Sequence, residues 1–324
     1  MNMSRRSACL VVGLIVASAP LAMADDYPSR PIRLIVPYAA GGGADTVARI
    51  VARRVGETIG QPIVIENRGG AGSIIGTDMV AKAEPDGYTL LLGQSGPISI
   101  NPAVYKDLRY DPVADFSPIT MTTAYPYILV VNSQNSAKSL QDFIAAAKSK
   151  AGGMNYGSTG IGAANHLVAE LFSSKSGMKL THIPYKGTAL AVADLLSGQI
   201  DMVFSDPISV LPHIESGKLR ALGVTSTKRT AIAPDIPTIA EAGFANFEAL
   251  AWHGILAPAK TPKEVVRKLN QEIAGALKHP ETNALLVKQA MEPIGNSAEE
   301  FAAFIQKDIA IWKAVASEAK ISVQ

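Results

Sequence analysis

The sequence predicts an α/β protein of two domains, with mostly parallel sheets covered by helices on both faces and a ligand cleft between the domains. Three observations support this fold class. Apolar strands alternate with amphipathic helices along nearly the whole chain. The chain is longer than one hydrophobic core usually serves. Each half also contains a glycine-rich loop between a strand and a helix.

The first 24 residues have the pattern of a cleaved signal peptide. Arg5 and Arg6 are followed by an apolar run, and the small residues at 22–24 fit a cleavage site. The apolar run is shorter than the roughly 20 residues that a membrane-spanning helix needs. The single cysteine, Cys9, lies in this segment. We therefore expect a mature chain that starts near Asp25, lies in the periplasm and contains no disulfide.

The mature chain is predicted to be neutral. Without residues 1–24 it has 300 residues, with 28 basic and 28 acidic side chains. This balance offers no electrostatic surface for nucleic acid or for an anionic membrane. We expect a monomer that binds neither of them.

Strands and helices alternate from the start of the mature chain. The apolar segments 32–36, 62–66 and 88–93 are predicted strands. A helix starts near Ala44, with apolar residues recurring at helical spacing, and a second helix lies near 73–83. Continuous apolar strands between such helices are typical of a parallel sheet that is covered on both faces.

The middle of the chain repeats this architecture after a loop-rich stretch at 94–118. The later strands are expected at 127–131, 154–158, 180–185, 200–205, 219–226 and 249–258. Two helices close the chain, and the segments 261–264 and 297–300 carry capping signals for them.

This order predicts one domain inserted into another. The first domain comprises residues 25–124 plus 249–324, and the second comprises 125–248. The chain crosses between them near 120–131 and 245–258, which would form the hinge.

The first glycine-rich loop points to an anion site. Residues 41–43 are all glycine and lead into a helix at Ala44. Unhindered N–H groups and the positive end of the helix dipole therefore converge on one point. We expect the N–H groups of Gly42, Gly43 and Ala44 to bind a carboxylate, and the ring of Tyr38 to cover it.

A second loop of this kind runs from the strand 154–158 into a helix that starts at about Ala163. Ser158, Thr159 and Gly160 are expected to bind the same carboxylate or its opposite end. Both loops follow the carboxyl ends of strands, so they would face each other across the cleft. Glycine also serves simply to turn a chain, but one long loop in each domain favours a shared anion site.

Further candidates also follow predicted strands. Ser95, after Gln94, is expected to line the cleft or to belong to an ordinary loop. Gly187 and Thr188 offer N–H groups at a helix start, beside Lys186, the only cation in these loops. A solvated side chain also explains Lys186.

Two aspartates have alternative roles. Asp45 either caps its helix or contacts a ligand ammonium group or a bridging water. Asp206 either accepts a hydrogen bond from a ligand or caps the helix that follows it.

Motifs for nucleotide binding and catalysis do not fit. The glycine spacings miss both G-x-G-x-x-G and the P-loop, and the segments GQSGP and GSTG miss G-x-S-x-G. The five histidines have no metal-binding spacing. His166 and Glu170 lie four residues apart on a predicted helix, which fits an ordinary packing pair. We expect no cofactor and no metal.

Several segments together resemble a known family. They are YPSRPIRLIVPYAAGGGADTVAR, VIENRGGAGSIIGTDMVAKAEPDGYTLLLG, MNYGSTGIGAANHLVAELF, THIPYKGTALAVADLLSGQIDMVF and LRALGVTS. They are similar to the extracytoplasmic receptors of tripartite tricarboxylate transporters, of the Bordetella uptake gene (Bug) type. The resemblance covers essentially the whole mature chain.

The resemblance implies a type II-like periplasmic binding protein that closes on a small carboxylate and delivers it to membrane permease subunits. It also implies that the carboxylate lies between the two glycine-rich loops. Ligands of this family include tricarboxylates, dicarboxylates, amino acids and aromatic acids, so membership does not name the ligand.

We therefore expect a binding protein and not an enzyme. The alternatives are a periplasmic lyase or hydrolase that acts on a small carboxylate, and a scaffold or adhesin without a ligand. Turnover of the bound acid would indicate the enzyme, and the absence of any saturable ligand would indicate the scaffold.

Overall fold

The computed structural model of the protein describes residues 27–38 and 40–323, so the predicted signal peptide lies outside the described residues. The helices and strands follow in this order: β1 (Ile32–Val36), α1 (Gly43–Ile59), β2 (Ile63–Asn67), η2 (Ala71–Ser73), α2 (Ile74–Ala81), β3 (Thr89–Gln94), η3 (Gly96–Ile100), α3 (Asn101–Val104), β4 (Phe116–Pro126), β5 (Ile128–Asn132), α4 (Leu140–Ser149), β6 (Met154–Ser158), α5 (Ala164–Ser176), β7 (Leu180–Pro184), α6 (Thr188–Ser197), β8 (Met202–Ser205), α7 (Pro207–Glu215), β9 (Leu219–Val224), β10 (Leu250–Pro258), α8 (Lys263–Lys278), α9 (Pro280–Lys288), β11 (Glu292–Pro293) and α10 (Ala298–Glu318). In this described part of the chain, no helix is both long enough and apolar enough to cross a bilayer.

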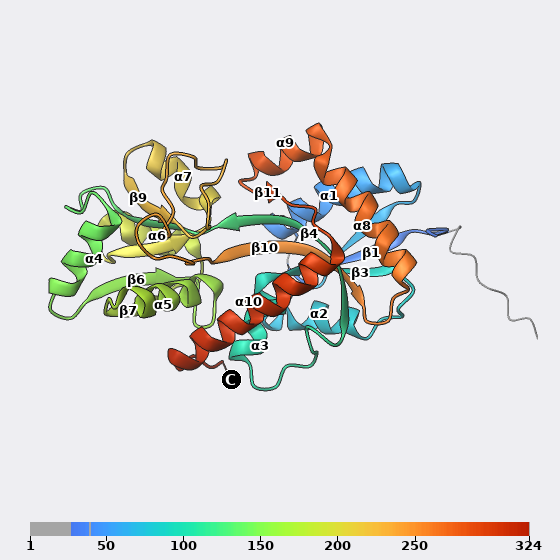
Figure 1. Ribbon diagram of the computed structural model, residues 1–324, viewed down its shortest axis with the longest axis horizontal. Helices are drawn as coiled ribbons and strands as arrows, with labels where there is room; N and C mark the ends of the chain where they lie inside the picture. Colours follow the sequence, from blue (N-terminus) through green and yellow to red (C-terminus); the bar gives the residue numbers. More distant parts are fainter. Residues whose placement is uncertain (1–26, 39, 324) are drawn as a thin grey trace, which may run out of the picture.

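The strands form two separate sheets, which lie side by side in Figure 1. One has six strands in the order β11-β4-β10-β3-β1-β2, and the other has five in the order β7-β6-β8-β5-β9. The predicted α/β class with two sheets and covering helices is confirmed.

Each sheet is mixed, which corrects the prediction of mostly parallel sheets. β1 pairs in parallel with β2 and β3, and β6 does so with β7 and β8. β10 runs antiparallel to both β3 and β4, and β5 runs antiparallel to β8 and β9. The reason is the chain path. β4 carries the chain toward the second sheet and β10 brings it back, so these two neighbours run in opposite directions (Figure 1).

Alternation along the strands builds a core on each face of each sheet. Leu34 and Val36 of β1 pack with α1 and α8, whereas Ile35 between them packs on the opposite face with the start of α10. β5 alternates in the same way: Leu129 packs with α4 and α5, and Val130 packs with α6 and α7. Because side chains alternate across a strand, an unbroken apolar run fills both cores.

Helix α10 packs against both halves of the molecule. Phe301 and Ile305, near its start, belong to a core of the six-stranded sheet. Trp312 and Val315, one to two turns from its end, belong to a core of the five-stranded sheet. Figure 1 shows this helix passing from one half toward the other.

The structure also corrects several local predictions. β4 occupies part of the stretch expected to be loop-rich, and α9 is an additional helix between the two predicted at the end of the chain. The capping box at Ser297 and Glu300 is confirmed. The one predicted at Thr261 is wrong, because its hydroxyl donates to the Pro258 carbonyl and α8 starts after Pro262 without a side-chain cap.

Candidate ligand site between the two sheets

A cavity of about 490 Å³ lies where the two halves meet. Its wall combines segments from the six-stranded side, the crossing strands, the second glycine-rich loop and the end of the chain. The lining residues are Tyr38, Gly72, Ser73, Gln94, Ser95, Gly96, Asn101, Tyr105, Tyr125, Tyr127, Thr159, Ile161, Gly162, Ala163, Ala164, Ala251, Trp252, His253 and Val323. Three of the predicted site residues, Tyr38, Ser95 and Thr159, are therefore brought together around one cavity.

The second glycine-rich loop contributes the start of α5 to this wall. Ala163 is the N-cap residue and offers no side-chain cap, and Ala164 is the first residue of the helix. The first N–H groups of a helix have no partner within the helix, and its dipole adds positive potential there. An anion in the cavity would therefore meet backbone donors and the positive end of a 13-residue helix.

The hydroxyl groups of this loop are used differently from the prediction. The Ser158 hydroxyl is fully buried, lies 2.5 Å from His182 Nε2 and accepts the N–H of Gly160. It therefore stabilises the loop from behind. Thr159 lines the cavity, and both its hydroxyl and its N–H donate to Asn165 Oδ1 at 3.1 Å. Neither Ser158 nor Gly160 is part of the cavity wall.

On the opposite wall, Tyr38 and the start of η3 lie together. A Cβ atom on Gly96 would lie 3.4 Å from the Tyr38 hydroxyl, so glycine lets this tyrosine approach the backbone. Ser95 precedes η3, and its side chain is nearly buried beside the cavity. These residues offer two hydroxyl groups opposite the start of α5.

Sequence reasoning missed the aromatic part of the wall. Tyr125 and Tyr127 come from the first crossing, and Trp252 and His253 come from β10. The rings of Tyr125 and His253 lie 6.4 Å apart between centroids. A polar or aromatic residue within an otherwise apolar strand, as in ALAWHGILAP, was the only signal for them.

The cavity is electrically neutral. In the part of the chain that the structure describes, no Lys, Arg, Asp or Glu lines it. Burial lowers the pKa of His253 to about 4 and raises the pKa of Tyr38 to about 12. Burial also raises the pKa of Tyr125 and Tyr127. At neutral pH these groups are uncharged hydrogen-bonding partners.

The first glycine-rich loop, with Gly42, Gly43 and Ala44, lies outside the wall of this cavity. It is closed on its own helix instead. The carboxylate of Asp45 accepts the Gly41 N–H at 2.9 Å and also bonds Arg49 and Asn67. These bonds, with that to Arg49 the strongest, hold the pKa of the buried Asp45 carboxyl below its usual value. Asp45 thus braces the loop.

The remaining candidates also lie off the wall. Gly187 is the N-cap of α6 and Thr188 its first residue, and neither lines the cavity. Asp206 accepts the Ser209 N–H at 2.9 Å and so caps α7, one of its two expected roles. Lys186 is exposed and likewise outside the wall.

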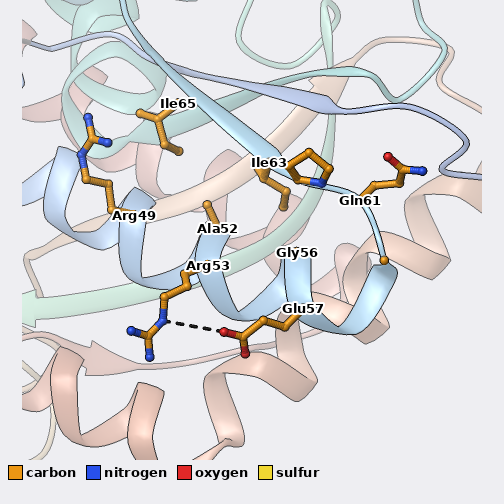
Figure 2. Close-up of a pocket in the computed structure, with 10 residues that line it drawn as sticks. Arg49, Ala52, Arg53, Gly56, Glu57, Gln61, Ile63 and Ile65 are labelled. Carbon is orange, nitrogen blue, oxygen red and sulfur yellow. Dashed lines mark ion pairs between the residues drawn. The ribbon is translucent and has the colours of Figure 1, made fainter.

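A larger hollow of about 660 Å³ lies outside α1 and β2. Figure 2 shows that its lining comes from this one helix, the following turn and the adjoining strand, with Arg53 directed at Glu57. Its arginines are already paired, since Arg53 also contacts Glu281 and Arg49 bonds Asp45. Because polar groups from both halves of the molecule converge on the cavity between the sheets, that cavity is a better candidate for a ligand site than the hollow outside α1.

Residues 47–321 match the profile of the tripartite tricarboxylate transporter family receptor, TctC. The chain belongs to this family. Protein BugT of Bordetella pertussis (strain Tohama I) is 37% identical over 322 residues, with 98% of each chain covered. The periplasmic binding protein BugD is 36% identical, with a TM-score of 0.73, and covers 92% of this chain and 100% of its own. A solved R. palustris protein with adipate is 35% identical, with a TM-score of 0.77, and covers 92% of this chain and 99% of its own.

Membership of the TctC family confirms the predicted resemblance and fold. The family and its solved structures are periplasmic solute-binding proteins and not enzymes. The alternative of a periplasmic lyase or hydrolase is therefore set aside. Among the described residues, no group of three or more His, Cys, Asp and Glu side chains is placed to hold a metal ion.

Proposed function

We propose that this receptor captures a small carboxylate in the cavity between its two sheets and delivers it to the permease subunits of a tripartite tricarboxylate transporter. The observation that carries the proposal is the uncapped start of α5 on the wall of a cavity built from both halves. A relative with 35% identity was solved with adipate, a dicarboxylate, which supports this ligand class.

Recognition in this proposal relies on neutral donors held in place before the ligand arrives. One carboxylate lies at the first-turn N–H groups of α5, near Ala164, with Thr159 beside it. The hydroxyl groups of Tyr38 and Ser95 bind from the opposite wall. Such donors are effective because they need little reorganisation and because closing the cavity excludes competing water.

Capture requires the two halves to close. We retain the predicted domains, 25–124 plus 249–324 and 125–248, with the hinge where β4 continues into β5 and where the chain returns to β10. The end of α10 packs on the second domain. Closure of the two domains must therefore either change this packing or move the end of α10 together with the second domain. Small-angle scattering should show a smaller radius of gyration with saturating ligand, and identical curves would contradict closure.

The proposed setting is the periplasm, with residues 1–24 removed as a signal peptide and the mature receptor acting as a monomer. Mass spectrometry of protein recovered from the periplasm should give a chain that begins at Asp25. Retention of the first 24 residues, or a defined oligomer in sedimentation, would contradict this part of the proposal.

Thermal unfolding with a panel of ligands tests the central proposal. The panel contains monocarboxylates, dicarboxylates including adipate, tricarboxylates and aromatic acids, with phosphate, sugars and cations as negative controls. A ligand at 100 times its dissociation constant stabilises the folded protein by about 2.7 kcal/mol, which is a readily measured shift. Stabilisation by the negative controls alone would show that the cavity does not select carboxylates.

A further inference from the structure

Three stacked rings lie behind the second glycine-rich loop. Tyr156 of β6, His182 of β7 and His166 of α5 follow one another. The centroids of the two imidazoles are 3.9 Å apart at 10°, and those of Tyr156 and His182 are 5.0 Å apart at 20°. None of the three lines the ligand cavity. The proposed capture mechanism therefore leaves them without a role.

Each imidazole bonds a different part of the loop. His166 Nδ1 accepts the Gly162 N–H at 3.1 Å. An accepting Nδ1 places the hydrogen of a neutral imidazole on Nε2, which lies 4.0 Å from Glu170 Oε1. His182 Nε2 contacts the Ser158 hydroxyl, which in turn accepts the Gly160 N–H at 3.0 Å.

These bonds act on the segment that faces the ligand. Gly160 and Gly162 have φ values of +132° and +77°, a region that side-chain-bearing residues rarely adopt. Between and after them, Ile161, Ala163 and Ala164 line the cavity. A bond to the Gly162 amide therefore holds the chain at the point where it enters α5.

We propose that His166 is a positioning residue of the ligand site, which holds residues 159–164 in their binding conformation only while its imidazole is neutral. The proposal rests on the proposed function, because it takes the cavity as the place where the ligand binds.

The hydrogen-bond pattern makes the loop sensitive to protonation of His166 rather than of His182. A proton on Nδ1 would face the Gly162 N–H, and two donors cannot share a hydrogen bond. His182 differs, because the Ser158 hydroxyl can accept from a protonated Nε2 and donate to the Gly160 carbonyl, 3.1 Å away. Protonation of both rings would also place two positive charges in contact.

The surroundings of His166 favour the neutral form. Tyr156 and His182 face the stack from β6 and β7. Glu170 of α5 faces Nε2, but its carboxylate already accepts the Tyr156 hydroxyl at 2.5 Å. Glu318 of α10 lies beside Glu170 on the wall of a shared hollow. Burial, and then the charge of His182, lower the pKa of His166 to about 4.

Selective labelling isolates the relevant amides in the ligand-free protein. Thr159–Gly160 is the single Thr–Gly pair in the sequence, and Ile161–Gly162 is one of four Ile–Gly pairs. Protein with ¹⁵N-glycine and ¹³C-carbonyl threonine or isoleucine therefore reports these two glycines by NMR. The variants are His166→Ala, which removes the acceptor, and His166→Asn, which keeps an acceptor near Nδ1 that cannot be protonated. His213→Asn on α7 is the control.

At neutral pH we expect the Gly162 amide to exchange with solvent about tenfold faster in His166→Ala than in the wild type. His166→Asn should restore slow exchange, and His213→Asn should leave it unchanged. As the pH falls toward about 4, the chemical shift of the Gly162 amide should change in the wild type and stay constant in His166→Asn. Equal exchange in His166→Ala and the wild type, or no rescue by His166→Asn, overturns the proposal.

Titration with adipate then separates the two proposals. If the wild type binds adipate, His166→Ala should bind it about tenfold more weakly and His166→Asn should bind it normally. Equal affinity of the wild type, His166→Ala and His166→Asn for adipate would refute the positioning role. If no carboxylate in the panel binds the wild type, the proposed function fails, and the amide exchange alone decides whether His166 holds the loop.

Discussion

The substitution Ala164→Pro removes one backbone donor from the proposed site and leaves the helix intact. Ala164 is the first residue of α5, where proline is well tolerated because the N–H has no partner within the helix. The preceding residue must be extended before a proline, and Ala163 already has φ −68° and ψ 155°. The backbone therefore accepts the change without strain.

The expected effect of Ala164→Pro follows from the hydrogen bond that it deletes. A bond from a backbone N–H to a charged carboxylate contributes about 1.5–3 kcal/mol, which corresponds to roughly tenfold to a hundredfold in affinity. Calorimetric titration with the best carboxylate from the thermal screen measures this loss. The unfolding temperature without ligand should change little.

Ala298→Pro is the matched control for Ala164→Pro. It places proline at the first position of α10, after an extended Ser297, away from the cavity wall. Its affinity should equal that of the wild type. If Ala164→Pro folds and binds the ligand with unchanged affinity, the start of α5 is not the carboxylate site and the reasoning is refuted.

Three other outcomes are expected. Gly162→Ala should abolish binding, because Gly162 has φ +77° and an added Cβ would lie 2.7 Å from Val323. Gly152→Ala, with φ +89° and open space around it, should bind normally by calorimetry. Thr159→Val should lower affinity about tenfold, because it removes the hydroxyl that bonds Asn165 and holds the loop at the cavity wall. Lys186→Met should have no effect, and the reverse order of the two affinities in titrations would move the site to a cationic surface. For His253 the folded pKa is lowered to about 4, so the unfolded chain takes up the proton first and stability is lost as the pH falls from about 6.5 through about 4. Urea unfolding at about pH 7.5 and 4.5 should show the wild type losing roughly 2–3 kcal/mol more than His253→Gln, and equal losses would refute a neutral buried imidazole.

Local sequence patterns were sufficient for most helices and strands. The predicted strands 32–36 and 154–158 coincide with β1 and β6, and the helix expected from about Ala163 begins at Ala164. Hydrophobic spacing identifies such elements because burial of one or both faces is encoded within a few consecutive residues. The capping box at Ser297 succeeded for the same reason.

Strand β4 escaped prediction because its stability comes from a distant partner. Its sequence FSPITMTTAYP contains two prolines and several threonines and has no continuous apolar run. It forms through pairing with β10, more than a hundred residues away. The antiparallel neighbours that make both sheets mixed depend on the same long-range pairing.

The sequence by itself determined the α/β class, the two sheets, the family and the one glycine-rich loop that lines the ligand cavity. All of these depend on short sequence patterns, namely the spacing of apolar residues, the positions of glycines and the family's sequence motifs. The tertiary structure decided which side chains share the cavity. It brought Tyr38, Ser95 and Thr159 together with an aromatic wall from 125–127 and 251–253, and it closed the first glycine-rich loop on Asp45. A binding cavity is formed by segments that are remote in the chain, and their approach depends on the packing of both sheets and α10, which no local pattern contains.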